Sequence, residues 1–586
     1  MKNVKLLPLI IPIFLSCGNP EGHQAFQEPE NPIETIARDW KETTPKLHAS
    51  FAPTDQKFKK QIPPNIAGSS GQKITSWKGE RVNLQMLVWS SEDINKIEIT
   101  PEALKGPGAS IIPTENVNVH PVRYVLSDEF LTGCGHRDKD TIPAYLVADI
   151  LENNLPFDLK EKTTRPVWIT IDIPANATNG SYHGEIEIKS SKGNSQTLSL
   201  TLDVQDLTLP SPSDWTFHLD LWQNPFSIAR LHNTELWSEE HLQVCGPYLK
   251  MLAQAGQKSI TTSILHRPWG GQTYDHFESM IQWTHQGENQ WSFDYEVFDK
   301  WVELAMDAGI TNQINCYSMV PWGNRVRYFD TDSAGHVTKS VKPGSEEFKS
   351  LWKPFLLSFR DHLKEKGWLS ITNIAMDERH VEEMKNTIDF IHEVTPEFNI
   401  ALAGNYHEEI ADDLKDLCVF HNPELNTQII TDRKEKGLIT TFYTSCAAPE
   451  HPNNFTFSPP AEQTLIGWYA AAKGFDGFLR WAYNSWVKDP LMDSRFITWP
   501  AGDTYQIYPG PLSSIRFEKL REGIQDFEKI RIIRERLKEQ DDQEGLEKLN
   551  SVLSAFTHQN ITSPGAAANL VKNAKKQLNE IIVEHL

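Results

Sequence analysis

Residues 461–484, AEQTLIGWYAAAKGFDGFLRWAYN, contain one complete unit of the fold: an amphipathic helix over 461–473, a glycine at 474 and a hydrophobic strand over 477–483. Gly474 stands directly after the helix, where a residue in the left-handed conformation satisfies the last helical carbonyls. The segment therefore predicts a helix, a tight turn and a strand in immediate succession, which is the repeating unit of α/β folds.

The same unit recurs from residue 217 onward, and Gly256, Gly309, Gly367 and Gly437 follow helical or polar stretches in the same way. Strands are predicted at 217–222, 259–265, 313–319, 371–378, 399–405, 417–422, 438–445 and 477–483, and helices at 239–255, 295–308, 346–366 and 461–473. Eight such units in about 300 residues predict a (β/α)8 TIM barrel. A doubly wound open sheet is the alternative.

Residues 46–210 show a different pattern, with polar and apolar residues alternating over 167–173, 184–188 and 198–204. Asn179-Gly180 between two of these runs is typical of a hairpin turn. Half-buried strands joined by tight turns predict an antiparallel β-sandwich, which ends at the Pro- and Ser-rich segment 210–213. We expect the barrel over 211–540 and C-terminal helices over 541–586. The stretch from Arg516 onward is predicted to close the barrel and to expose a solvated helical face.

The first 17 residues have the features of a targeting segment: basic Lys2 and Lys5, an apolar run over 6–15, and Leu15-Ser16-Cys17-Gly18. This ending resembles a bacterial lipobox, in which the cysteine becomes lipidated. We therefore expect residues 1–17 to be a lipoprotein signal peptide ending at Cys17, and the polar segment 18–45 to be a flexible tether. Membrane contact is expected only through this anchor, on the outer membrane or the periplasmic face.

The composition limits the class of partner. The 586 residues are 39% hydrophobic and 23% charged, with a formal net charge of −21, which opposes binding to a phosphate backbone and excludes a nucleic-acid partner. The 18 Trp, 14 Tyr and 27 Phe suit stacking on sugars as well as core packing. Besides Cys17, five scattered cysteines predict neither a disulfide framework nor a zinc cluster, and we expect no metal or cofactor.

In a barrel the reacting groups come from the carboxyl ends of the strands. These predicted ends carry a set of carboxylates, amides, histidines and aromatics that suits a sugar pocket: Asp220, Trp222, His266, Tyr317, Asp377, Glu378, Asn405, Tyr443, Ser445, Trp481 and Tyr483.

Two adjacent acids, Asp377 and Glu378, follow the apolar strand ITNIAM. Neighbouring strand residues point to opposite faces of a sheet. In one interpretation, therefore, one acid is buried in an ion pair with Arg379 or Arg480 and the other faces solvent. If the chain leaves strand geometry here, both carboxylates face the pocket. Their repulsion then raises one pKa and yields a proton donor beside a charged group, as in glycosidases.

Three stretches together resemble glycoside hydrolase family 123. They are the strand ending in Asp377-Glu378, the segment 477–484 (GFLRWAYN), and the run from Pro500-Ala501-Gly502-Asp503 through Tyr508-Pro509-Gly510 to 516–524 (RFEKLREGI). The resemblance covers essentially the whole chain after the targeting segment. It implies a β-N-acetylgalactosaminidase with an N-terminal β-sandwich before a (β/α)8 barrel.

The resemblance also implies retaining, substrate-assisted hydrolysis, in which the 2-acetamido group of the sugar is the nucleophile. Glu378 would then be the general acid and base, and Asp377 would hold the acetamido N–H and stabilise the oxazolinium intermediate. Candidate donors to the acetamido oxygen are Tyr443, Tyr483 and Tyr317, Trp481 is a candidate wall for its methyl group, and Asp220, His266, Asn405 and Asp503 are candidates for binding hydroxyls.

The expected activity is removal of terminal β-linked N-acetylgalactosamine from a glycan or glycolipid. Two alternatives stay open at this stage. One is a glycosidase of another specificity on the same scaffold, for example a conventional retaining enzyme that pairs Glu378 with Asp220. The other is a surface glycan-binding lipoprotein without activity, against which the intact acid pair argues.

Overall fold

The computed structural model describes residues 26–32, 40–130, 133–138, 141–191, 193, 195–288, 290–421, 424–447 and 451–586. The predicted signal peptide with Cys17, and part of the predicted tether, lie outside these residues. Within them, none of the helices has both the length and the apolar character needed to cross a bilayer.

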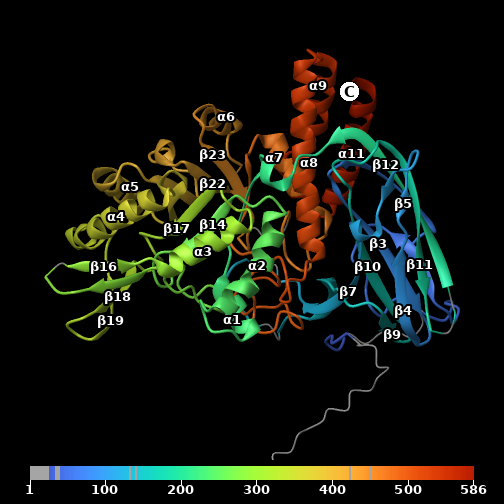
Figure 1. Cartoon of the computed structure of the whole chain (residues 1–586), viewed down its shortest axis with the longest axis horizontal. Helices are drawn as coiled ribbons and strands as arrows, with labels where there is room; N and C mark the ends of the chain where they lie inside the picture. The colour runs from blue at the N-terminus through green and yellow to red at the C-terminus, as the bar shows by residue number, and fades with distance from the viewer. Residues whose placement is uncertain are drawn as a thin grey trace, which may run out of the picture.

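The first body is a β-sandwich, on the right of Figure 1. Among the described residues it has a five-stranded sheet in the order β1-β3-β10-β7-β8 and a seven-stranded sheet containing β2-β12-β11-β4-β9 with β5 and β6. The strands are β1 (His48–Ala52), β2 (Gly71–Lys78), β3 (Arg81–Ser90), β4 (Ile94–Pro101), β5 (Leu104–Lys105), β6 (Ile111–Ile112), β7 (Val117–Ser127), β8 (Tyr145–Leu151), β9 (Phe157–Leu159), β10 (Thr163–Asp172), β11 (Gly180–Lys189) and β12 (Ser195–Thr208). Met86, Val167, Ile186 and Leu202 belong to its core.

The sandwich is antiparallel as predicted, except that β2 and β12 pair in parallel. These two strands are far apart in sequence, so no hairpin forces them to run in opposite directions.

The second body is the predicted barrel, whose sheet in the described chain has eight strands in the order β13-β24-β23-β22-β21-β20-β17-β14. They are β13 (His218–Leu221), β14 (Ser259–Ser263), β17 (Gln313–Tyr317), β20 (Thr372–Met376), β21 (Asn399–Gly404), β22 (Asp416–Phe420), β23 (Ile439–Tyr443) and β24 (Gly477–Arg480). Neighbouring pairs run in parallel, and a bridge between Leu219 and Gln257 nearly closes the ring.

Helices surround the barrel: α1 (Pro225–His232), α2 (Glu239–Ala253), α3 (Glu296–Asp307), α4 (Glu346–Lys366), α5 (Val381–Val394), α6 (Thr427–Glu435) and α7 (Ala461–Lys473). Residues 405–415, all described, carry a short 3-10 helix in place of an α-helix. Two connections also build a four-stranded sheet that the sequence did not predict, from β15 (Gln282–His285), β16 (Trp291–Asp294), β18 (Arg325–Asp330) and β19 (Gly335–Ser340).

The chain ends in α8 (Ile515–Glu539), α9 (Gln543–Ser554), α10 (His558–Ile561) and α11 (Ala566–His585). Helix α8 lies between the barrel and the sandwich (Figure 1). Helix α8 packs closely on α7 where Gly467 of α7 meets Gly523 of α8. A Cβ atom on Gly467 would lie only 1.8 Å from the carbonyl oxygen of Gly523, so a larger residue would clash there.

The expectation of a solvated helical face is wrong for the first part of α8, where Arg516, Glu518, Lys519, Asp526, Glu528 and Lys529 are buried, whereas Glu535, Arg536, Lys538 and Glu539 in its last turns are exposed. Arg516 Nε donates to Asp149 of β8 over 2.9 Å, and Glu528 accepts from the backbone N–H of Phe217, at the start of the barrel, over 2.7 Å. Charged residues that pair with the sandwich and the barrel give the same sequence pattern as charged residues that face water. The hydrophobic periodicity of the sequence therefore could not distinguish a buried helical face from a solvated one.

Candidate active site

Strand β20 ends at Met376, and Asp377 and Glu378 follow it outside regular strand geometry. Both acids line one cavity of about 220 Å³ at the carboxyl end of the barrel, which we call the acid-pair pocket. Its lining consists of Cys134, Trp222, Gln272, Trp322, Asp377, Glu378, Ala403, Tyr443, Ser445, Cys446, Ala447, Leu479, Trp481 and Trp499. The chain therefore leaves the strand at the point that the catalytic interpretation of the pair required.

Asp377 is the more enclosed member of the pair, and its Oδ2 accepts a hydrogen bond from the indole N–H of Trp322 over 2.9 Å. Desolvation raises the pKa of Asp377 to about 7, and the charge of Glu378 acts in the same direction. Hydrogen bonds from the Glu378 backbone and from Trp322 oppose this rise. Asp377 is thus poised to change its charge near neutral pH.

Glu378 lies at the exposed side of the pocket and accepts a hydrogen bond from the hydroxyl of Tyr443, which ends β23. Burial and the charge of Glu378 raise the pKa of Tyr443, so its phenol keeps its proton. The two acids therefore differ in environment: Asp377 is held by an indole within the pocket and Glu378 by a phenol at its open side.

Tryptophans form much of the pocket wall. Trp481 and Trp499 meet edge to face with ring centroids 5.7 Å apart, and the indole of Trp499 donates to the carbonyl of Gln272 over 2.8 Å. Flat apolar faces next to carboxylates suit the C–H face and the hydroxyls of a sugar.

Four of the residues singled out from the sequence meet in the acid-pair pocket: Asp377, Glu378, Tyr443 and Trp481. Trp222 and Ser445, also noted at strand ends, join them. The other predicted sugar contacts do not line this pocket.

Asp220 and Tyr317 are buried inside the barrel. Asp220 accepts a hydrogen bond from Asn315 over 3.1 Å, and burial raises its pKa to about 7. The ring of Tyr317 packs against Trp222 and Trp269 at centroid distances of 4.6 and 4.9 Å. A strand-end position places a residue near the pocket but does not decide whether its side chain points above or below the pocket floor.

Tyr483 and Asp503 bind other protein groups. The Tyr483 hydroxyl donates to the Tyr248 carbonyl over 3.0 Å, and buried Asp503 forms an ion pair with Arg480. Asp503 also accepts a 3.4 Å hydrogen bond from the indole of Trp481, so it orients a pocket wall instead of lining the pocket.

His266 and Asn405 lie further out. His266 pairs with Glu278 over 2.5 Å and lines a different cavity, with Arg327, near the four-stranded sheet. Asn405 is exposed just beyond β21.

The ion-pair interpretation of the two acids fails, because both arginines are engaged elsewhere. Arg379 pairs with Glu383 over 2.7 Å and also donates to Asn324, while Arg480 pairs with Asp503.

Sequence reasoning missed Trp322, Trp499, Gln272 and the cysteines of the pocket. Apart from Cys446, which directly follows the strand predicted over 438–445, none of these residues stands at a predicted strand end. Cys134 and Cys446 form a disulfide although they are 312 residues apart in sequence, a bond that the scattered cysteines did not signal. Cys245, Cys316 and Cys418 are buried free thiols.

Comparisons with known proteins agree with this architecture. A model described as the glycoside hydrolase 123 catalytic domain matches residues 222–533, and one described as the glycoside hydrolase 123 N-terminal domain matches residues 51–190. No curated protein sequence matches the chain.

A solved family 123 glycoside hydrolase from Clostridium perfringens, described for its hydrolysis of glycolipid glycans, is similar over 92% of this chain and 97% of its own, with 28% identity and a TM-score of 0.82. A family 5 xyloglucanase from Bacteroides ovatus gives a TM-score of only 0.27 at 8% identity, over 81% of this chain and 100% of its own. The matched domains, their order and the acid pair at the barrel mouth lead to one conclusion: the chain belongs to glycoside hydrolase family 123.

Proposed function

We propose that this glycoside hydrolase removes terminal β-linked N-acetylgalactosamine from glycans with retention of configuration, using the 2-acetamido group of the substrate as nucleophile. The observation that carries the proposal is the placement of adjacent Asp377 and Glu378 in one pocket with different environments. The described lining holds no further carboxylate. Asp220, the example of a partner acid for a conventional double displacement, is buried and does not line the pocket.

The raised pKa of Asp377 provides a proton within the pair near neutral pH. A bound acetamido N–H that donates to Asp377 favours its charged form, and the proton then belongs on Glu378. Substrate binding in this way prepares a charged Asp377 beside a protonated Glu378. Tyr443 keeps Glu378 oriented toward the open side, where the leaving group departs.

In the first step the acetamido oxygen attacks C1 while the glycosidic C1–O bond breaks, and Glu378 gives its proton to the departing oxygen. The charged Asp377 stabilises the oxazolinium cation. In the second step Glu378 takes a proton from water, the water oxygen bonds to C1, and the bond from C1 to the acetamido oxygen breaks. Two inversions leave the β configuration.

A volume of about 220 Å³ suits a single sugar residue and so favours release of a terminal sugar. We infer that the natural substrates include the glycan of a glycolipid, which is what the similar Clostridium perfringens enzyme is described as hydrolysing.

A panel of 4-nitrophenyl glycosides tests the proposed function. We expect the β-N-acetylgalactosaminide to be hydrolysed at least about 10³-fold faster than the β-galactoside, because a positioned intramolecular nucleophile is lost with the acetamido group. NMR of the first product should show the β-anomer. Equal rates on the two substrates would place the nucleophile on the protein and contradict substrate assistance.

We also propose that lipidation of Cys17 anchors the protein to a bacterial membrane, on the outer membrane or the periplasmic face. The Cys134–Cys446 disulfide supports a location outside the cytoplasm, because such bonds persist in oxidising compartments.

For Cys17→Ala we expect loss of the protein from the membrane fraction and of incorporated labelled fatty acid, because the thiol that carries the lipid is gone. Cell fractionation with immunoblotting measures this, and an unchanged membrane fraction would contradict the anchor. Hydrolysis of the aryl substrate by the released variant should match that of the wild type, since residue 17 lies far in sequence from the pocket residues.

A further inference from the structure

One wall of the acid-pair pocket comes from the sandwich. Cys134 belongs to the connection between β7 and β8, yet it lines the pocket together with Cys446, to which it is bonded. Cys446 follows β23 and lies three residues beyond Tyr443, the residue that holds Glu378. The disulfide thus joins a sandwich loop to the barrel loop that follows the tyrosine.

A second set of contacts binds the same sandwich loop to the barrel loop that carries Trp499. The backbone N–H of Gly135 donates to the carbonyl of Thr498 over 3.2 Å, and that of Arg137 donates to the carbonyl of Ile497 over 2.8 Å. The Arg137 side chain adds a hydrogen bond from Nε to the carbonyl of Phe496 over 3.1 Å. Residues 496–498 therefore run along the sandwich loop immediately before Trp499 reaches the pocket.

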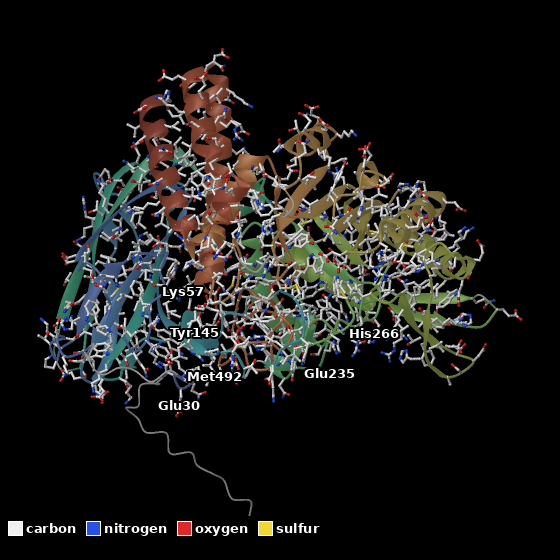
Figure 2. The ribbon with its side chains drawn as sticks, turned by 180° about the vertical axis from the view of Figure 1, so that it is seen from behind. Glu30, Lys57, Tyr145, Glu235, His266 and Met492 are labelled. Atoms are coloured by element: carbon white, nitrogen blue, oxygen red, sulfur yellow. A yellow bond between two sulfur atoms is a disulfide. The ribbon has the colours of Figure 1, made fainter. Side chains whose placement is uncertain are left out.

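Arg137 is itself fixed in place. Its guanidinium forms a 2.5 Å ion pair with Asp128, in which both side chains are buried, and it lies over the ring of Phe130 at 4.5 Å. The neighbouring part of the barrel loop is held as well, because the backbone N–H of Leu126 in β7 donates to the carbonyl of Met492 over 2.9 Å. Figure 2 shows Met492 close to Tyr145 of β8 at the lower edge of the molecule.

We propose that sandwich residues 133–138 act as a positioning clamp for the pocket wall. The disulfide fixes the wall at Cys446, and Arg137 fixes the loop that presents Trp499. Together they set the width of the pocket and hence its affinity for substrate, without touching the reacting atoms. This inference rests on the proposed catalytic use of the pocket.

The clamp is sensitive to reductants. A dithiol such as dithiothreitol supplies two electrons and two protons, which break the S–S bond and leave thiols on Cys134 and Cys446, while the dithiol becomes a cyclic disulfide. The wall at Cys446 is then free to move relative to the sandwich loop.

For the double variant Cys134→Ser/Cys446→Ser we expect KM to rise about 10-fold on the aryl glycoside that the wild type hydrolyses best, with kcat within about 3-fold of wild type. The reason is that Asp377, Glu378 and Tyr443 stand at barrel strand ends and keep their places. Dithiothreitol should raise the KM of the wild type to the same extent and leave the double variant unchanged, which serves as the matched control.

Arg137→Ala should likewise raise KM, whereas Arg137→Lys, which keeps the charge beside Asp128, should recover part of the loss. Amide hydrogen exchange over 444–447 and 496–499 gives a readout independent of turnover, and both segments should exchange faster in the variants. Folded variants with unchanged KM and unchanged exchange would overturn the clamp. If no glycoside in the panel is hydrolysed, the proposed function fails, and the exchange data alone decide whether the wall is clamped.

Discussion

Replacing Asp377 with asparagine is expected to lower kcat/KM by about 10²- to 10³-fold on both an aryl and a natural disaccharide substrate, because the oxazolinium loses its carboxylate whatever group departs. The pH profile should change too. Glu378 delivers the proton that the pair holds below the pKa of about 7, and the pair loses this proton as the pH rises, so wild-type kcat/KM should fall above about pH 7. The variant, whose residue 377 no longer titrates, should lose this alkaline limb.

Asp220→Asn is the matched control for that experiment. Asp220 is another buried carboxyl with a pKa of about 7, but it lies outside the pocket lining. The control should keep both the rate and the alkaline limb of the wild type. If it loses as much activity as Asp377→Asn, the barrel interior carries the nucleophile and the conventional mechanism returns.

Glu378→Gln is expected to lose about 10²- to 10⁴-fold in kcat on a natural sugar leaving group, and much less on the 4-nitrophenyl glycoside. The leaving oxygen of a sugar is basic and needs a proton to depart, whereas 4-nitrophenolate departs with little help. Steady-state kinetics of both variants on both substrates measure this contrast.

The comparison between the two variants assigns the roles. A leaving-group dependence seen for Asp377→Asn and absent for Glu378→Gln would exchange the two assignments. Wild-type rates for both variants would remove the pair from the mechanism. Circular dichroism and thermal unfolding establish that each variant is folded before its rate is interpreted.

The barrel was predictable because glycines that follow helical stretches mark the start of five strand segments: Gly256, Gly309, Gly367, Gly437 and Gly474. Gly474, for example, has a φ of +83° directly after α7, as the sequence predicted. The carboxyl ends of the strands were less certain, and the strand predicted over 371–378 stops at Met376. That early end brings Asp377 and Glu378 into one pocket.

The loop residues of the site could not be predicted, since hydrophobic periodicity carries no information about loops. Trp322 reaches Asp377 from the connection after β17, and Trp499 comes from the long segment after β24. Cys134 enters from the other body altogether. Nothing in a single sequence indicates that residues separated in this way share one wall.

Helix α8 also affects the order in which the two domains can fold during synthesis. Its residues 515–539 leave the ribosome after the strands of both the sandwich and the barrel, yet they bind the sandwich through Asp149 and the start of the barrel through Phe217, which directly precedes β13. We therefore expect folding of one domain after another during synthesis to stall, because the sandwich and the barrel both lack α8 until the chain is nearly complete. A chain that crosses a membrane unfolded meets no such delay, since α8 is already present when folding begins.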